Sequence, residues 1–280
     1  MKFFRFLLLI LFVNTLLLSQ NIEAQKSTAS LNVSIIEKQF VIPNLNTISH
    51  KIWVYLPPNY ETSSHKFPVI YMHDAQNLFD SKTSYNGEWN VDESLNELYK
   101  NTNKSFIVVG IENGEHERMN EYTPWPNKNY GGGKGAEYIR FIVHNLKPYI
   151  DSTYRTKPQQ KYTGLIGSSL GGLISYYGGL KYPDIFGKIG ALSTSFWFSN
   201  QVVDFSIQHG NINNVKMFLL VGEKEGEQMV EGTLNTEKLL LETGFKSKNL
   251  TSKIVEEGEH NEAFWRSEFL TVLKWLYNIK

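Results

Sequence analysis

Continuous apolar segments alternate along this chain with segments in which apolar residues recur every three or four positions. Continuous apolar runs are typical of strands buried on both faces. We expect such strands at residues 67–72 and 106–111, and further strands just before Gly167 and at residues 188–193, 215–221 and 251–255. Helical spacing is clearest at Ile139, Ile142, Leu146 and Tyr149, and helices are also expected at residues 91–99, 234–243 and 264–277. Strands that alternate with helices predict an α/β fold, with a mostly parallel sheet and helices on both faces.

The first two expected strands, residues 32–41 and 50–56, form a separate unit. Too few residues separate them for a crossover helix, so we expect them to pair antiparallel at one edge of the sheet.

The N-terminus has the features of a secretory signal peptide. Lys2 and Arg5 precede an almost unbroken apolar run over residues 6–18, interrupted at Asn14, and small residues follow. The run is shorter than the roughly 20 residues that a membrane-spanning helix needs. We therefore expect export from a bacterial cell and no stable membrane insertion after the leader is removed.

Cleavage is expected after Ser19 or Ala24, and the sequence does not decide between them. We accordingly assign residues 1–24 to the signal peptide and residues 25–280 to a single α/β domain, located in the periplasm or secreted.

Composition excludes several classes of protein. The chain has 28 basic and 28 acidic residues, and its lysines are scattered, so nothing favours nucleic acid as a partner. It has no cysteine, which excludes a disulfide and a lipid-modified cysteine. A hydrophobic content of 41% is ample for the core of a large domain.

The sequence around Ser169 carries the strongest chemical signal. Gly167-Ser168-Ser169-Leu170-Gly171 fits G-x-S-x-G, between an apolar run and a helical run of small residues. At such an elbow the serine has a strained backbone conformation and its hydroxyl projects above the sheet. The amide of Leu170 is expected to point at a developing oxyanion.

A serine nucleophile needs a base and an acid. In α/β hydrolases, which place the serine at such an elbow, the chain order is serine, acid, histidine. His260 comes just after the last expected strand, whereas His209 lies in a polar segment before the strand that should carry the acid. Glu223 and Glu225 both follow that strand, and Glu225 is preferred.

The loop after residues 67–72 begins with His73 and Asp74, at the edge of the sheet where α/β proteins bind ligands. We expect these two side chains to hold the loop by hydrogen bonds. The second oxyanion donor is expected to be the amide of Ala75 or Gln76.

Aromatic residues and one arginine are candidates for substrate binding. Residues 112–134 form a long segment rich in asparagine, glycine and aromatic residues, and such segments are usually functional. An aromatic platform and a carboxylate-binding arginine are one interpretation, and loops that pack their own aromatic side chains are the other. The candidates are Trp89, Arg118, Tyr122, Trp125 and Trp197.

Taken together, these motifs resemble the "Putative esterase", or esterase D-like, family of α/β hydrolases, which includes enterochelin, feruloyl and acetylxylan esterases. The resemblance rests on residues 71–80, 88–92, 118–125, 167–172, 222–226 and 258–260. It implies that Ser169, Glu225 and His260 are nucleophile, acid and base, and that Leu170 and Ala75 form the oxyanion hole. Similar proteins often have glycine where this chain has Ala75.

The expected activity is that of a serine esterase, a carboxylic ester hydrolase that works through an acyl-enzyme and needs no metal or cofactor. Its substrate would be an extracellular ester, either an acetyl or feruloyl group on a carbohydrate or a siderophore lactone. The alternatives are an acyltransferase with the same triad and a non-catalytic binding module on the same fold.

Overall fold

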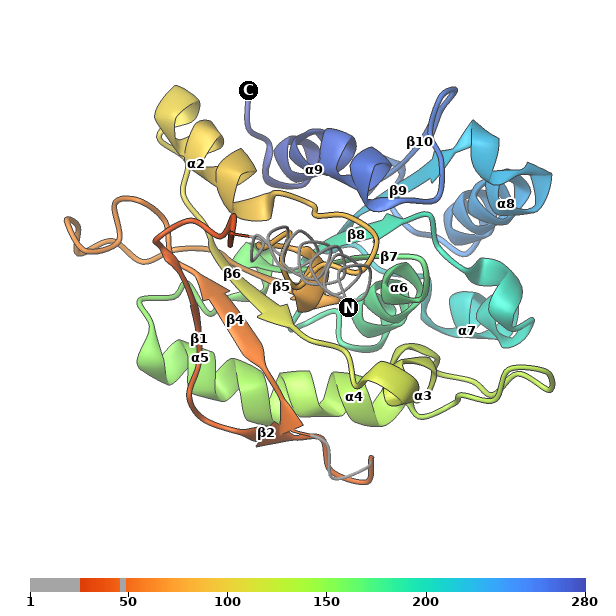
Figure 1. The fold of residues 1–280 in the computed structure, drawn as a ribbon. Coiled ribbons are helices and arrows are strands. Elements are labelled where there is room, and N and C mark those ends of the chain that lie inside the picture. Colours follow the sequence, from red (N-terminus) through yellow and green to blue (C-terminus); the bar gives the residue numbers. More distant parts are fainter. Residues whose placement is uncertain (1–25, 46–48) are drawn as a thin grey trace, which may run out of the picture.

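The computed structural model describes residues 26–45 and 49–280. These residues form an eight-stranded sheet covered by helices (Figure 1). The expected signal peptide and its cleavage after Ser19 or Ala24 lie outside the described residues and stay predictions.

The strands lie in the order β1-β4-β6-β5-β7-β8-β9-β10. Neighbours from β6 to β10 are parallel, whereas β4 pairs antiparallel with both β6 and β1. This confirms the mostly parallel sheet with an antiparallel N-terminal edge, as in α/β hydrolases. The strands are β1 (Val33–Ile35), β4 (Ile52–Tyr55), β5 (Val69–His73), β6 (Ile107–Ile111), β7 (Thr163–Ser168), β8 (Lys188–Leu192), β9 (Lys216–Gly222) and β10 (Leu250–Val255).

At the N-terminal edge, the two expected strands pair antiparallel as predicted, but each is divided into two. Their other halves, β2 (Phe40–Val41) and β3 (Ser49–His50), form a small separate sheet.

Both faces of the large sheet are covered by apolar packing, because successive side chains of a strand point to opposite faces. In β4, Ile52 and Val54 join one buried cluster, whereas Trp53 and Tyr55 join the other. Side chains of α2 (Val91–Thr102) and α9 (Glu262–Tyr277) belong to the second cluster.

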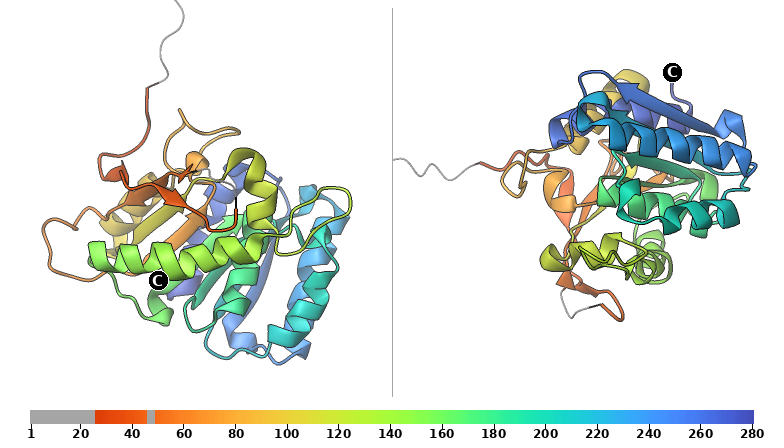
Figure 2. Two further views of the ribbon diagram at one scale, coloured as in Figure 1. Left: turned by 90° about the horizontal axis from the view of Figure 1, so that it is seen from below. Right: turned by 90° about the vertical axis from the view of Figure 1, so that its right-hand side faces the viewer.

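The other helices contribute to the first cluster. They are α3 (Arg118–Tyr122), α4 (Gly135–Phe141), α5 (Lys147–Thr153), α6 (Leu170–Lys181), α7 (Gln201–His209) and α8 (Glu227–Glu242). A π-helical turn, Ile142–Leu146, joins α4 to α5, and the expected stripe of Ile139, Ile142 and Leu146 is buried along this segment. Figure 2 shows α7 and α8 side by side at one end of the sheet.

Two predictions about helices were wrong. His209 does not lie in a polar loop: it ends α7, where its ring stacks on Phe205 at 4.3 Å. Helix α8 begins at Glu227 rather than at residue 234. The prediction missed its first turns because they are largely exposed and polar and lack an apolar stripe.

The four loops that carry the predicted site leave the carboxyl ends of β5, β7, β9 and β10. Parallel strands end at the same edge of a sheet, so the topology brings these loops together. Within the described ranges, no helix combines the length and the apolar character that crossing a membrane requires.

Candidate active site

Ser169 occupies a sharp turn between β7 and α6. Its φ of 59° and ψ of −122° lie in a region that non-glycine residues rarely adopt, and such strain costs about 1–3 kcal/mol. A Cβ at Gly167 would lie 2.6 Å from the carbonyl oxygen of Gly171, so the turn requires glycine there. The strained elbow expected from the sequence is therefore present.

Glu225 and His260 are in contact above the ends of β9 and β10. Nδ1 of His260 lies 2.6 Å from Oε2 of Glu225. The Glu225 side chain is fully buried, whereas 39% of the His260 side chain is exposed. Glu223 is exposed, so the geometry favours Glu225 of the two candidate acids. With Nδ1–H donating to the carboxylate, Nε2 of His260 is left as the free proton acceptor.

The second oxygen of Glu225 is held by two donors. Oε1 accepts hydrogen bonds from the amide of Gly222 at 2.8 Å and from the hydroxyl of Ser193 at 2.6 Å. Nε1 of Trp265 donates in turn to that hydroxyl at 2.8 Å. The Trp265 ring also meets the His260 ring edge-on at 5.1 Å. The glutamate is thus fixed in position before any substrate arrives.

Sequence reasoning missed Ser193 and Trp265 as parts of this network. Ser193 directly follows β8 and has a φ of 44°, unusual for serine, but only the fold shows that it faces Glu225. Trp265 lies in the helix expected at residues 264–277, where an apolar residue is explained by burial alone. A pattern of apolar positions does not predict that its indole N–H donates a hydrogen bond.

Ser169 and His260 line one cavity of about 890 Å³. Among the described residues, the hydrogen-bond partner of Ser169 Oγ is Ser195 Oγ at 3.5 Å, and not His260. Catalytic hydrogen bonds are often long in unliganded sites and shorten when substrate binds. The arrangement is consistent with a nucleophile and a base that await a substrate.

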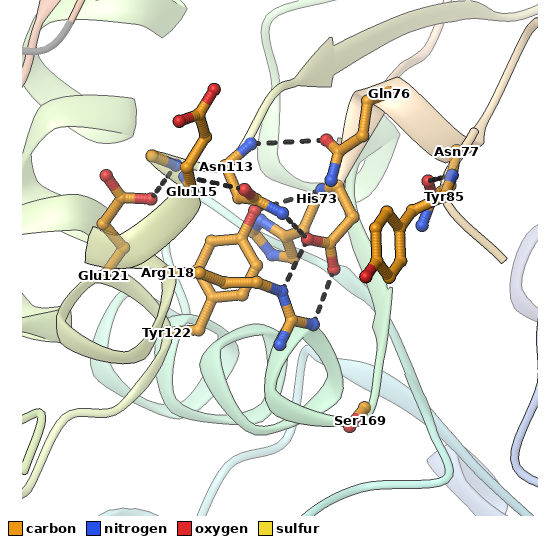
Figure 3. Close-up of polar contacts among 12 residues, drawn as sticks. His73, Gln76, Asn77, Tyr85, Asn113, Glu115, Arg118, Glu121, Tyr122 and Ser169 are labelled. Atoms are coloured by element: carbon orange, nitrogen blue, oxygen red, sulfur yellow. Dashed lines mark hydrogen bonds and ion pairs between the residues drawn. The ribbon is translucent and has the colours of Figure 1, made fainter. Parts of the chain in front are cut away.

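Asp74 also lines the cavity, and its partners Arg118, Asn113 and Tyr122 are labelled in Figure 3. Its carboxylate accepts two hydrogen bonds from Arg118, at 2.8 and 2.9 Å, and one from Asn113 at 2.6 Å. Its amide donates to the hydroxyl of Tyr122 at 3.0 Å. Burial alone would raise the pKa of Asp74, but the Arg118 guanidinium outweighs burial and lowers that pKa below its usual value.

His73 supports the same loop from beneath. Its Nδ1 lies 2.8 Å from the Tyr138 hydroxyl, and burial lowers the pKa of His73 to about 3, so the ring is neutral at physiological pH. The prediction that His73 and Asp74 hold the loop by hydrogen bonds is confirmed.

The expected oxyanion donors flank the elbow. Leu170 is the first residue of α6, where helix amides have no partner within the helix. Ala75 begins a 3₁₀ turn directly after β5, the strand beside β7, and Gln76 lines the cavity. These positions agree with the expectation, and the roles of Leu170, Ala75 and Gln76 stay predictions.

The expected aromatic platform is not assembled. Trp89 lines the cavity but is almost wholly buried against Trp265, with ring centroids 5.7 Å apart. Tyr122 is completely buried beneath the Asp74 loop. Trp125 packs edge-on against Tyr177 and Phe205, away from the cavity.

Trp197 lies in a different depression and is 43% exposed. Tyr122 is buried because it ends a short helix, α3 (Arg118–Tyr122), and its side chain belongs to the first core cluster. Arg118 does line the cavity, with its Nε and Nη2 bound to Asp74.

Three carboxylates gather outside the cavity. Oxygen atoms of Glu88, Asp92 and Glu93 lie within 4.8 Å of one another, a grouping that the sequence did not predict. Burial, together with the adjacent Asp92, raises the pKa of Glu93 to about 7. Thr28 and Ser30 donate hydrogen bonds to Glu88 and Asp92, so the cluster fastens the N-terminal segment to the domain.

The fold and this site define the protein as an α/β hydrolase with a serine elbow. More specifically, the chain belongs to the family described as "Putative esterase", whose sequence model matches residues 47–276.

Individual relatives agree with this assignment. The chain is 31% identical over 242 residues to the uncharacterized protein YbbA of Bacillus subtilis, covering 82% of this chain and 93% of that one. It is 24% identical to an endo-1,4-beta-xylanase/feruloyl esterase of Xylanibacter ruminicola, covering 76% of this chain but only 27% of the relative.

Among solved structures, the enterobactin esterase FES from Shigella flexneri superposes with a TM-score of 0.70 at 16% identity. The match covers 89% of this chain and 60% of that protein, less than two thirds of its length. At this identity the likeness concerns the fold. Family membership supports ester hydrolysis as the activity.

Proposed function

We propose that this protein is a serine carboxylic ester hydrolase that works through an acyl-enzyme intermediate. The observation that carries the proposal is the geometry around Ser169. A strained serine at a strand–helix turn shares one cavity with a histidine whose Nδ1 is held by a buried glutamate. An activated nucleophile needs such a base and such an orienting group.

In the proposed mechanism, Ser169 Oγ attacks the ester carbonyl carbon while Nε2 of His260 takes its proton. Glu225 keeps the imidazole in the required tautomer and stabilises the imidazolium without taking the proton itself. The amides of Leu170 and Ala75 or Gln76 would receive the oxyanion. His260 then gives its proton to the departing alkoxide, and water releases the acid by the reverse sequence of steps.

The cavity walls support a substrate of moderate size. A volume of about 890 Å³ lies within the usual range for small-molecule sites. Most side chains around it are polar, including Asn77, Asn86 and Asn113, which suit an oxygen-rich substrate. Because a signal peptide is predicted, we further propose that the ester is extracellular or periplasmic.

Turnover of simple esters tests this function. Purified mature protein should release the acid from methyl or p-nitrophenyl esters of acetic and ferulic acids, and Ser169→Ala should lower kcat by about 10⁴-fold or more. Retention of wild-type kcat by the variant would contradict the proposal. Product analysis with an added alcohol shows whether water or the alcohol receives the acyl group.

A further inference from the structure

The carboxylate cluster of Glu88, Asp92 and Glu93 lies apart from the residues that line the catalytic cavity. Glu88 precedes α2, whereas Asp92 and Glu93 belong to the first turn of that helix. One oxygen of each carboxylate lies within 4.8 Å of the other two. Asp92 has no exposed surface and Glu88 is only 6% exposed, so this is not a group of solvated surface charges.

Hydrogen bonds from the N-terminal segment satisfy only part of the cluster. Oε2 of Glu88 accepts from the Thr28 hydroxyl at 2.9 Å, and Oδ2 of Asp92 accepts from the Ser30 amide at 2.7 Å. Oε1 of Glu88, Oδ1 of Asp92 and Oε2 of Glu93 are also buried, but they have no hydrogen-bond partner among the described residues. Buried acceptors without a partner are rare and costly, and a charge increases the cost. Three buried oxygens are thus left for a ligand.

No basic side chain neutralises the carboxylate cluster. Among the described residues, none of its three carboxylates forms an ion pair. Arg266 approaches Glu88, but its guanidinium donates to the Glu88 carbonyl at 3.1 Å and to the Asn90 side chain at 3.4 Å. Buried charges are normally paired or bound to a metal ion. The missing counter-charge therefore points to a cation.

The donor atoms favour calcium over other common metal ions. All three candidate ligands are carboxylates, which suit a hard cation, whereas zinc sites are built mainly from nitrogen and sulfur. Calcium takes roughly six to eight oxygens at about 2.3–2.6 Å, so two of its ligands can lie up to about 5 Å apart. Oxygens within 4.8 Å of one another fit around one such ion. Magnesium, with bonds of about 2.0–2.1 Å, allows only about 4 Å.

Two of the carboxylates are oriented by neighbouring groups. The Thr28 hydroxyl that donates to Glu88 accepts in turn from the Ser81 amide at 2.8 Å. Ser30, whose amide donates to Asp92, also accepts at its hydroxyl from the Asn96 side chain at 3.2 Å. Groups that orient the ligands of a metal ion in this way raise the affinity of the site.

We propose that the carboxylate cluster binds one calcium ion, and that this ion fastens the N-terminal segment to α2. Glu88, Asp92 and Glu93 each supply at least one oxygen, and water completes the coordination. Because Thr28 and Ser30 donate to two of these carboxylates, an ion that fixes the carboxylates also fixes residues 28–30. The proposal concerns stability and does not depend on the proposed esterase function.

Melting curves of the mature protein at pH 8 test the proposal. About 10 mM calcium chloride should raise Tm by about 3–8 °C relative to protein in EDTA, because the ion binds the folded state. Asp92→Asn removes one charge with little change of shape and should abolish most of this rise. Glu93→Gln, at a less buried position, provides the same comparison if Asp92→Asn folds poorly. Glu97→Gln is the matched control, because Glu97 is an exposed acid of the same helix, and it should keep the full rise.

Direct binding separates a bound ion from charge screening. Calorimetry should show one calcium ion per wild-type protein and at least tenfold weaker binding to Asp92→Asn. The Ser30 amide should exchange with solvent at least fivefold more slowly in calcium than in EDTA, because its acceptor is Asp92. An equal rise in Tm with sodium chloride at the same ionic strength would overturn the proposal. So would a rise that persists in both Asp92→Asn and Glu93→Gln, or the absence of any calcium effect, which would leave protonation as the means of relieving the repulsion.

Discussion

Two polar networks flank Ser169, and they differ in how tightly each is fixed. In one of them, His260 keeps 39% of its side chain exposed, and its hydrogen-bond partner among the described residues is Glu225. In the other, Asp74 is held by Arg118, Asn113 and the Tyr122 hydroxyl. The group proposed to carry protons stays accessible, whereas the groups that position the loop are bound on several sides. Within the lining of one cavity, the exposed His260 and the tightly bound Asp74 thus differ in how strongly they are held.

Removing the charge of Glu225 should have the largest effect. In Glu225→Gln, the amide oxygen should take the place of Oε1, where Gly222 and Ser193 donate. The amide NH₂ would then face Nδ1 of His260 and force the wrong tautomer. We expect kcat to fall by about 10⁴-fold with little change in thermal stability. Glu223→Gln is the matched control, because Glu223 is exposed, and equal losses in both variants would contradict this assignment.

Breaking the network around Asp74 should lower stability more than it lowers kcat. Arg118→Met leaves the mostly buried Asp74 carboxylate without its cation, which should cost about 3–5 kcal/mol and lower Tm by about 10 °C. Adding Asp74→Asn should restore much of this loss, since asparagine tolerates the φ of 56° at that position. Arg140→Met, which breaks the exposed pair with Glu137, should cost under about 1 kcal/mol. Similar melting curves for Arg118→Met and Arg140→Met would contradict the claim that the Asp74 network stabilises the fold.

The support behind Glu225 should have a smaller effect. Ser193→Ala removes one donor to the carboxylate and leaves the indole N–H of Trp265 without its acceptor. We expect kcat to fall about tenfold while KM changes little, because one charge-assisted hydrogen bond is lost. Ser206→Ala removes a buried hydroxyl that contacts Tyr176, away from the cavity, and should lower stability without lowering kcat. A loss of kcat that is the same in both variants would show a merely structural role for Ser193.

The smallest effect concerns the carboxylate cluster outside both networks. Burial and Asp92 raise the pKa of Glu93 to about 7, above its usual 4.5, so the folded state disfavours the ionised form. The stability that this shift contributes is present below about pH 4.5 and is lost as pH rises through about 7. Glu93→Gln should therefore melt at a higher temperature than wild type at pH 8, with the gap closing toward pH 5. The exposed Glu97→Gln on the same helix should show no such gap.

Sequence patterns predicted the fold and the chemical core of the site for a physical reason. Buried parallel strands require apolar runs, which mark their positions in the sequence. The antiparallel edge follows from the short separation of the first two strands, which leaves no room for a crossover helix. Gly167 and Ser169 mark the elbow because that turn excludes a Cβ at one position and strains the backbone at the other.

The sequence did not predict contacts that depend on tertiary packing. Trp125 and Tyr122 looked like substrate contacts because they lie in a long aromatic segment, but α3 turns Tyr122 into the core. The bond between Ser193 and Glu225 joins residues 32 positions apart, and no local pattern encodes it. The sequence likewise did not predict that the carboxylates of Glu88, Asp92 and Glu93 lie within 4.8 Å of one another.

The central claim is that Ser169 is an activated nucleophile, and labelling with a fluorophosphonate tests it most directly. Intact mass should show one covalent adduct on the wild-type mature protein and none on Ser169→Ala. Glu225→Gln should be labelled far more slowly, and Arg118→Met, at a temperature where it is folded, should still be labelled. No adduct on folded wild-type protein, or an adduct that persists in Ser169→Ala, would contradict the account.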